Sequence, residues 1–86
     1  ICGSGVGVDI VANKFPNIRS ALGFLPDQVM EARSDDDTNV LALAADFLEP
    51  EQAKKILSVW LQTPFDEDAR DKRRIEKIKQ IDYPVR

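Results

Sequence analysis

Three glycines at every second position follow a cysteine close to the start of the 86-residue chain. The stretch CGSGVG covers residues 2–7 and contains Gly3, Gly5 and Gly7. Because glycine has no side chain to block a ligand, the backbone N–H groups of such a loop can converge on negative charge and hold it where a helix begins. The spacing matches neither the dinucleotide fingerprint nor a P-loop, so a tight turn with purely structural glycines is the alternative.

Cys2 and Ser4 are the side chains of this stretch that could carry chemistry. A thiol beside converging N–H groups has a lowered pKa and favours the thiolate, which makes Cys2 a candidate base or nucleophile. The alternative is a small residue buried at the end of a strand. The hydroxyl of Ser4 can donate to the same ligand or can hydrogen-bond within its own turn.

Two arginines near the end of the chain form a second candidate site. Arg70 and Arg74 are four residues apart, so they share one face of a helix, and paired guanidinium groups bind phosphate well. Asp66, Glu67 and Asp71 occupy positions from which they could pair with these bases. An ordinary solvated face with ion pairs is therefore the alternative.

The composition is that of one small, acidic globular domain. Hydrophobic residues make up 43% of the chain, and 12 Lys and Arg against 15 Asp and Glu give a net charge of −3. This balance offers no basic field for nucleic acid, and the longest apolar run, residues 40–45, is too short to cross a membrane. We therefore expect a cytoplasmic protein that binds neither nucleic acid nor membrane.

Cysteine and histidine usage limits the chemistry further. The chain has one cysteine and no histidine, which excludes an internal disulfide and removes the most common zinc ligand. We expect no metal site and no cofactor.

Apolar spacing predicts strands that alternate with helices, which is typical of a parallel α/β sheet. Residues 1–2 look like the end of a strand. Further strands are expected at 18–24 and 39–44, and helices at 8–14, 26–33, 50–62 and 66–81, the last of them closed by Pro84. In such folds ligands bind at the carboxyl ends of the strands, so the loops of interest are 2–8, 25–26 and 44–49.

The start of the chain suggests that residues 1–86 are the C-terminal part of a single domain. The sequence begins with Ile, and a strand of two residues cannot anchor a parallel sheet. We expect the isolated 86-residue chain to unfold without a cooperative transition, and a sharp transition of normal enthalpy would contradict this.

Four separated motifs, in this order, resemble the ribose-5-phosphate isomerase B and galactose-6-phosphate isomerase family. They are ICGSGVGVDIVANKFPNIRSAL, DDDTNVLALA, AKKILSVWLQTPF and ARDKRRIEKI. The resemblance implies a Rossmann-like three-layer α/β/α sandwich with a parallel sheet, present as its C-terminal part. It also implies a homodimer or homotetramer that interconverts aldose and ketose forms of a phosphorylated sugar through an enediolate, without a metal.

The resemblance also implies roles for individual residues. Cys2 matches the base that moves a proton between the first two sugar carbons. Ser4 and the amides of Gly3, Gly5 and Gly7 match the loop that stabilises the enediolate. The residues that match substrate-binding positions are Asp36, Asn39, Arg70 and Arg74.

The sequence departs from the family pattern at two places. Asp35 and Asp36 stand where the family has a His-Asn pair, so one of them would replace the ring-opening histidine, and Asp46 stands where the family has a phosphate-binding arginine. Two alternatives follow: a non-catalytic or partner-dependent subunit of the same family, and a module that binds phosphate or nucleotide without chemistry.

Overall fold

The computed structural model describes residues 1–81, so the predicted role of Pro84 lies outside the described residues. The elements are α1 (Val6–Ala12), β1 (Ser20–Gly23), α2 (Pro26–Asp36), β2 (Val40–Leu43), α3 (Pro50–Gln62) and α4 (Ala69–Ile81). Within this part of the chain, no helix combines the length and the apolar character needed to span a bilayer.

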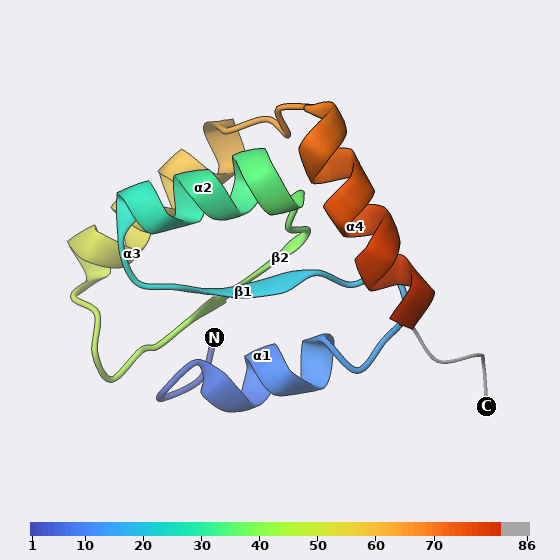
Figure 1. The fold of residues 1–86 in the computed structure, drawn as a ribbon. Helices are drawn as coiled ribbons and strands as arrows, with labels where there is room; N and C mark the ends of the chain where they lie inside the picture. The colour runs from blue at the N-terminus through green and yellow to red at the C-terminus, as the bar shows by residue number, and fades with distance from the viewer. Residues whose placement is uncertain (82–86) are drawn as a thin grey trace.

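The strands form a parallel sheet between two layers of helices, as the sequence predicts. Ser20 to Gly23 pair in register with Val40 to Leu43, and a parallel bridge joins Cys2 to Ala44 just beyond β2. Figure 1 shows α2 and α3 on one face of the sheet and α1 on the other. The glycine loop therefore starts at the carboxyl end of β2, where ligands bind in parallel α/β folds.

A small core holds α2 and α3 against the sheet. Its centre consists of Val29 of α2, Leu43 of β2 and Ile56 of α3. Val29 and Ile56 are 0% and 1% exposed, and burial of one such side chain contributes about 1.5–3 kcal/mol. Gly23 fits between them, because a Cβ there would lie 3.0 Å from Val29 and 3.1 Å from Ile56. Met30, the next residue of α2, lies outside this core and is 45% exposed.

Two helices begin at residues that the sequence did not indicate. α1 starts at Val6 rather than residue 8, because Gly5 already caps it in the left-handed region, with φ 74°. α4 starts at Ala69 rather than residue 66. Glu67 has φ 59°, and the carboxylate of Asp68 accepts a 2.8 Å hydrogen bond from the N–H of Arg70. The acids before α4 are thus part of a turn and an N-cap, and not of the first helical turn.

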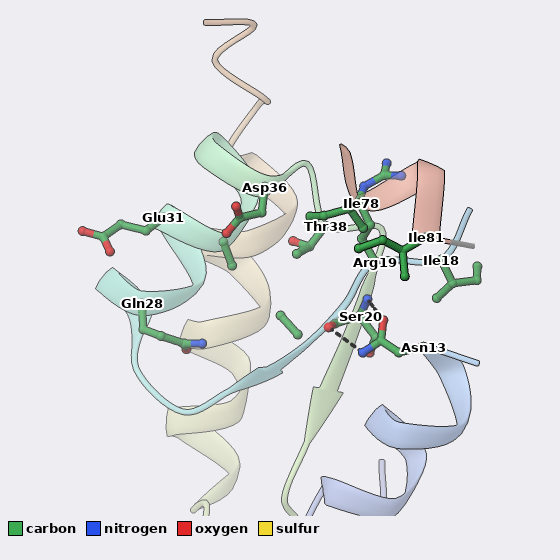
Figure 2. Close-up of a pocket in the computed structure, with 12 residues that line it drawn as sticks. Asn13, Ile18, Arg19, Ser20, Gln28, Glu31, Asp36, Thr38, Ile78 and Ile81 are labelled. Atoms are coloured by element: carbon green, nitrogen blue, oxygen red, sulfur yellow. Dashed lines mark hydrogen bonds between the residues drawn. The ribbon is translucent and has the colours of Figure 1, made fainter. Parts of the chain in front are cut away.

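Amide side chains cover the outer edge of β1, which would otherwise present unpaired backbone groups. Asn13 accepts from the N–H of Ser20 at 2.8 Å and donates to its carbonyl at 3.1 Å (Figure 2). Gln28 donates to the carbonyl of Leu22 at 2.9 Å and accepts from the N–H of Phe24 at 3.1 Å. These two side chains imitate a neighbouring strand and so protect the edge from pairing with another chain.

We expect Asn13→Ala to lower the free energy of unfolding of the full-length protein by about 1–2 kcal/mol, because two edge hydrogen bonds are lost. Asn13→Asp keeps the acceptor for the N–H of Ser20 but sets an oxygen against the Ser20 carbonyl, so it should lose at least as much. Urea denaturation measures both, with exposed Lys14→Ala as the control. An Asn13→Ala protein as stable as the control would show that the amide does not stabilise the edge.

Candidate functional site

The glycine loop is fixed against the end of β2 by backbone hydrogen bonds. The N–H of Ala45 donates to the carbonyl of Cys2 at 2.9 Å, and the N–H of Asp46 donates to the carbonyl of Gly3 at 2.9 Å. The chain then turns at Gly5 into α1. A Cβ at Gly5 would lie 2.5 Å from a methyl carbon of Leu22, so the positive φ and the close packing both require glycine at this position.

Backbone amides gather around the thiol of Cys2, which is half-buried. The pKa of Cys2 is lowered, mainly by a hydrogen bond from the backbone N–H of Val8 and further by those of Gly5 and Gly7, while burial opposes the shift. The loop thus favours the thiolate at the end of the sheet, where the sequence predicted an anion pocket beside a thiol.

The lowered pKa gives a direct prediction. Hydrogen bonds from the amides stabilise the thiolate, so Cys2 in the folded full-length protein should become half-ionised at a lower pH than in the unfolded protein. The rate of alkylation by iodoacetamide against pH measures this ionisation, and the protein in concentrated urea serves as the control. Identical profiles in the two states would show that the amides do not act on the sulfur.

Ser4 and Gly7 lie on the exposed side of the same loop. The hydroxyl of Ser4 accepts from the N–H of Val6 at 3.3 Å, so the structural role that the sequence left open for Ser4 is present. A Cβ at Gly7 would meet nothing within 4 Å. Gly7 is therefore not required by packing, and its contribution to the site comes from its backbone amide.

Asp46 lies against the loop, and its place there was not evident from sequence spacing. A Cβ at Gly3 would lie 2.6 Å from a carboxylate oxygen of Asp46, so the carboxylate covers the backbone of Gly3. Where the resemblance implies a phosphate-binding cation, this chain thus holds an anion beside its oxyanion loop.

The two arginines lie at the other end of the strands from Cys2. Arg70 and Arg74 stand on α4, 3.4 Å and 3.8 Å from the same oxygen of Asp71, with their side chains 59% and 65% exposed. α4 packs against α2, and Figure 1 shows α4 beside the start of β1, away from the N-terminus. Within one chain, the predicted phosphate clamp and the predicted base are not brought together.

Carboxylates gather between the end of α2 and the start of α4. Oxygens of Asp35, Asp66 and Asp71 lie within 4.8 Å of one another. The pKa of Asp71 is raised, first by a side-chain hydrogen bond with Asp66 and then by burial, while Arg70 opposes the shift. Burial, followed by the charges of Asp35 and Asp71, also raises the pKa of Asp36.

Asn39 precedes β2 at the same end of the sheet as the arginines. Its side chain accepts from the N–H of Arg19 at 2.8 Å and donates to the carbonyl of Asn17 at 2.8 Å. Asn39 therefore holds the segment before β1 in place, and its binding of substrate stays a prediction.

A cavity of about 650 Å³ lies between the edge of β1 and the end of α4. Figure 2 shows its polar side, where Asn13 and Ser20 face each other, together with Asp36 and the apolar side chains of Ile78 and Ile81. Its lining does not include Cys2 or the glycine loop. The cavity is thus separate from the thiol, and Asp36 is the predicted site residue that borders it.

Comparison with known proteins gives a consistent result. Residues 1–78 match the family described as Ribose/Galactose Isomerase. Ribose-5-phosphate isomerase B of Escherichia coli (strain K12) is 40% identical over 82 residues, which are 95% of this chain and 54% of that protein. D-erythrulose-4-phosphate isomerase of Pectobacterium atrosepticum is 38% identical over 83 residues, covering 96% of this chain and 54% of that protein.

Solved structures agree with the sequence comparison. Type B ribose 5-phosphate isomerase of Trypanosoma brucei superposes with a TM-score of 0.90 at 42% identity, covering 92% of this chain and 53% of that one. Ribose-5-phosphate isomerase B of Mycoplasma genitalium, solved with bound ribulose-5-phosphate, gives 0.88 at 37% identity, with coverages of 92% and 51%. The chain spans about half the length of these relatives.

Proposed function

We propose that this chain, which belongs to the ribose/galactose isomerase family, carries the proton-transfer half of a sugar-phosphate isomerase site. The substrate is an aldose phosphate of the ribose 5-phosphate or galactose 6-phosphate type. The observation that carries the proposal is the set of amides, from Val8, Gly5 and Gly7, that lower the pKa of the Cys2 thiol. A cytoplasmic location stays a prediction from the sequence.

The chemistry follows from a thiolate and N–H donors on one loop. The Cys2 thiolate removes the proton from carbon 2 of the open-chain aldose, the C–H electrons form the C1–C2 double bond, and the carbonyl electrons move onto oxygen 1. The thiol then returns the proton to carbon 1, and the carbonyl re-forms at carbon 2 as the proton of oxygen 2 moves to oxygen 1. We assign that last transfer to the Ser4 hydroxyl.

The negative charge of the enediolate is held by backbone amides rather than by a metal ion. The amides of Gly3, Gly5 and Gly7 are the proposed donors, and each preorganised donor of this kind is worth about 3 kcal/mol of barrier. Because both the base and the donors are protein groups, the proposed reaction needs no metal and no cofactor. The purified full-length protein should convert pentose or hexose aldose phosphates into ketose phosphates, and this assay tests the proposal.

A complete site requires a second copy of the chain in this proposal. Arg70 and Arg74 lie at the opposite end of the strands from Cys2, so the substrate phosphate can reach them only on a neighbouring subunit. We therefore propose a homodimer or homotetramer in which the clamp of one subunit serves the thiol of another. Such sites occur in pairs across a two-fold axis.

Mixing two inactive variants tests this arrangement. Cys2→Ala and Arg70→Ala/Arg74→Ala proteins should each be inactive, but an equal mixture after dissociation and reassembly should recover about a quarter of wild-type activity. Half of the dimers are then mixed, and each has one intact site. Each variant dissociated and reassembled on its own is the control, and it should stay inactive. No recovery, despite proven subunit exchange, would place both halves of the site in one chain.

One observation favours the alternative of a partner-dependent subunit. The Asp46 carboxylate against Gly3 adds negative charge beside the loop that has to hold an enediolate, which weakens its stabilisation. In this alternative the purified homomer has no isomerase activity and gains it only with a related subunit that supplies its own cysteine. Activity of the homomer alone, abolished by Cys2→Ala, excludes the alternative.

A further inference from the structure

The acidic cluster between α2 and α4 contains a buried carboxylate oxygen that receives no hydrogen bond from an N–H or O–H donor of the described residues. Asp71 is 1% exposed, and within residues 1–81 no such donor reaches its Oδ2, while its contact with Asp66 needs a proton that the two acids share. Its other oxygen faces Arg70 and Arg74 at 3.4 Å and 3.8 Å. A buried charged oxygen without a partner is costly, so a ligand that binds it would be strongly favoured.

The neighbours of Asp71 are carboxylates from two other segments. Asp35 comes from the last turn of α2, and Asp66 from the turn before α4, and both place an oxygen within 4.8 Å of one on Asp71. Backbone and side-chain contacts hold this arrangement, since the N–H of Asp66 donates to the carbonyl of Ser34 at 2.9 Å and the Ser34 hydroxyl donates to Asp35 at 2.9 Å. The three donors are therefore fixed by the fold.

The charge around the cluster also calls for a cation. Asp36 lies beside Asp35, Asp66 and Asp71, and within the described residues the ion pairs of these four acids are those of Asp71 with Arg70 and Arg74. When all four acids are ionised, the formal charge of this group is −2, which one divalent cation neutralises. Without a cation, the close approach of Asp66 and Asp71 requires a shared proton.

We propose that Asp35, Asp66 and Asp71 form a binding site for a calcium-sized divalent cation that joins the end of α2 to the start of α4. All donors are carboxylate oxygens, which suit hard cations and do not favour zinc or copper. The absence of histidine, which argued against zinc, does not bear on such a site. The proposal does not rest on the isomerase function.

The kind and number of donors favour calcium over magnesium. Three carboxylates from separate segments can each offer an oxygen to one ion, which suits Ca²⁺, because it takes about 6–8 oxygen ligands in a flexible geometry. Mg²⁺ demands a near-ideal octahedron and usually keeps several of its waters, so it binds such a cluster less well. Water completes the coordination on the side of Asp66, which is exposed.

Cation binding would also change what the arginines can do. In the structure Arg70 and Arg74 are engaged by Asp71, and the surrounding negative charge opposes the approach of a phosphate. A bound cation takes over as the counter-charge of Asp71 and frees both guanidinium groups for an anion. The site would thus tune the phosphate clamp, although its existence can be tested without any sugar phosphate.

Titration calorimetry of the full-length protein with calcium chloride, in the absence of sugar phosphate, tests the proposal. We expect one calcium ion per chain with a Kd below about 1 mM and at least about tenfold weaker binding of magnesium. Calcium should also raise the melting temperature, because it binds the folded state. The proposal would be overturned if no calcium bound at concentrations up to about 10 mM. It would also be overturned if the cluster bound only protons, as the pH is lowered, and no calcium.

Variants locate the ion. Asp35→Asn and Asp66→Asn should each weaken calcium binding by at least about tenfold, and both leave the contacts of Asp71 with the arginines in place. Asp71→Asn should abolish binding, and the other two variants keep the test decisive if this buried substitution prevents folding. Asp27→Asn, an exposed carboxylate at the other end of α2, is the matched control. Unchanged affinity in Asp35→Asn and Asp66→Asn would contradict the site.

Discussion

Cys2→Ala in the full-length protein is expected to lower kcat for aldose–ketose conversion by about 10³-fold, the contribution of a well-placed general base. The reason is local: the thiol is the group around which the amides of Val8, Gly5 and Gly7 converge. Alanine removes the base and leaves the loop and its N–H donors in place. The KM for the sugar phosphate should change little, because the proposed phosphate contacts are elsewhere.

Cys2→Ser distinguishes loss of the base from a disturbance of the loop's packing. A serine hydroxyl fills nearly the same space but does not ionise near neutral pH, so this variant should be nearly as inactive as the alanine variant. Thermal unfolding should show that both variants stay folded. Turnover within about twofold of wild type in either variant would remove Cys2 from the mechanism.

Gly5→Ala is expected to be the most destabilising single substitution in the loop, by about 2–4 kcal/mol. Gly5 has φ +74°, and a Cβ there would lie 2.5 Å from a Leu22 methyl carbon and 3.1 Å from the backbone nitrogen of Ala44. The backbone would have to move away from β2, and the start of α1 would move with it. Urea denaturation of the full-length protein measures the loss.

Gly7→Ala is the matched control for this effect. It makes the same chemical change two residues later, where a Cβ meets nothing within 4 Å, inside a helix that alanine favours over glycine by about 1 kcal/mol. Gly7→Ala should therefore be as stable as wild type or slightly more so. Equal stability of the Gly5→Ala and Gly7→Ala proteins would contradict the geometry described for Gly5.

The part of the site that sequence alone predicted is local in the chain. A cysteine followed by alternate glycines indicated an anion pocket at the end of a strand. The structure places these residues on one loop at the end of β2, because a loop of this length has few other conformations, and its binding of an anion stays a prediction. The α/β order and the bounds of α3, Pro50–Gln62, were predictable as well. Proline at its first position and apolar residues at helical spacing gave strong signals.

The parts that sequence did not predict depend on contacts between distant segments. The run of acids from Asp66 suggested a first helical turn, but the left-handed Glu67 delays the helix to Ala69, and propensity does not reveal such a turn. Asp35 and Asp71 are far apart in sequence, and only the packing of α2 on α4 brings them together. The carboxylate of Asp46 over Gly3 has the same origin, since it depends on the pairing of two loop ends.

The most direct test of the central claim is a crystal structure of the full-length protein with a hydroxamate analogue of the enediolate bound. The account predicts an analogue oxygen about 2.7–3.1 Å from loop amides such as those of Gly5 and Gly7, with the Cys2 sulfur against the carbon that gives up its proton. An analogue bound in a cavity that neither the sulfur nor these amides reach would contradict it.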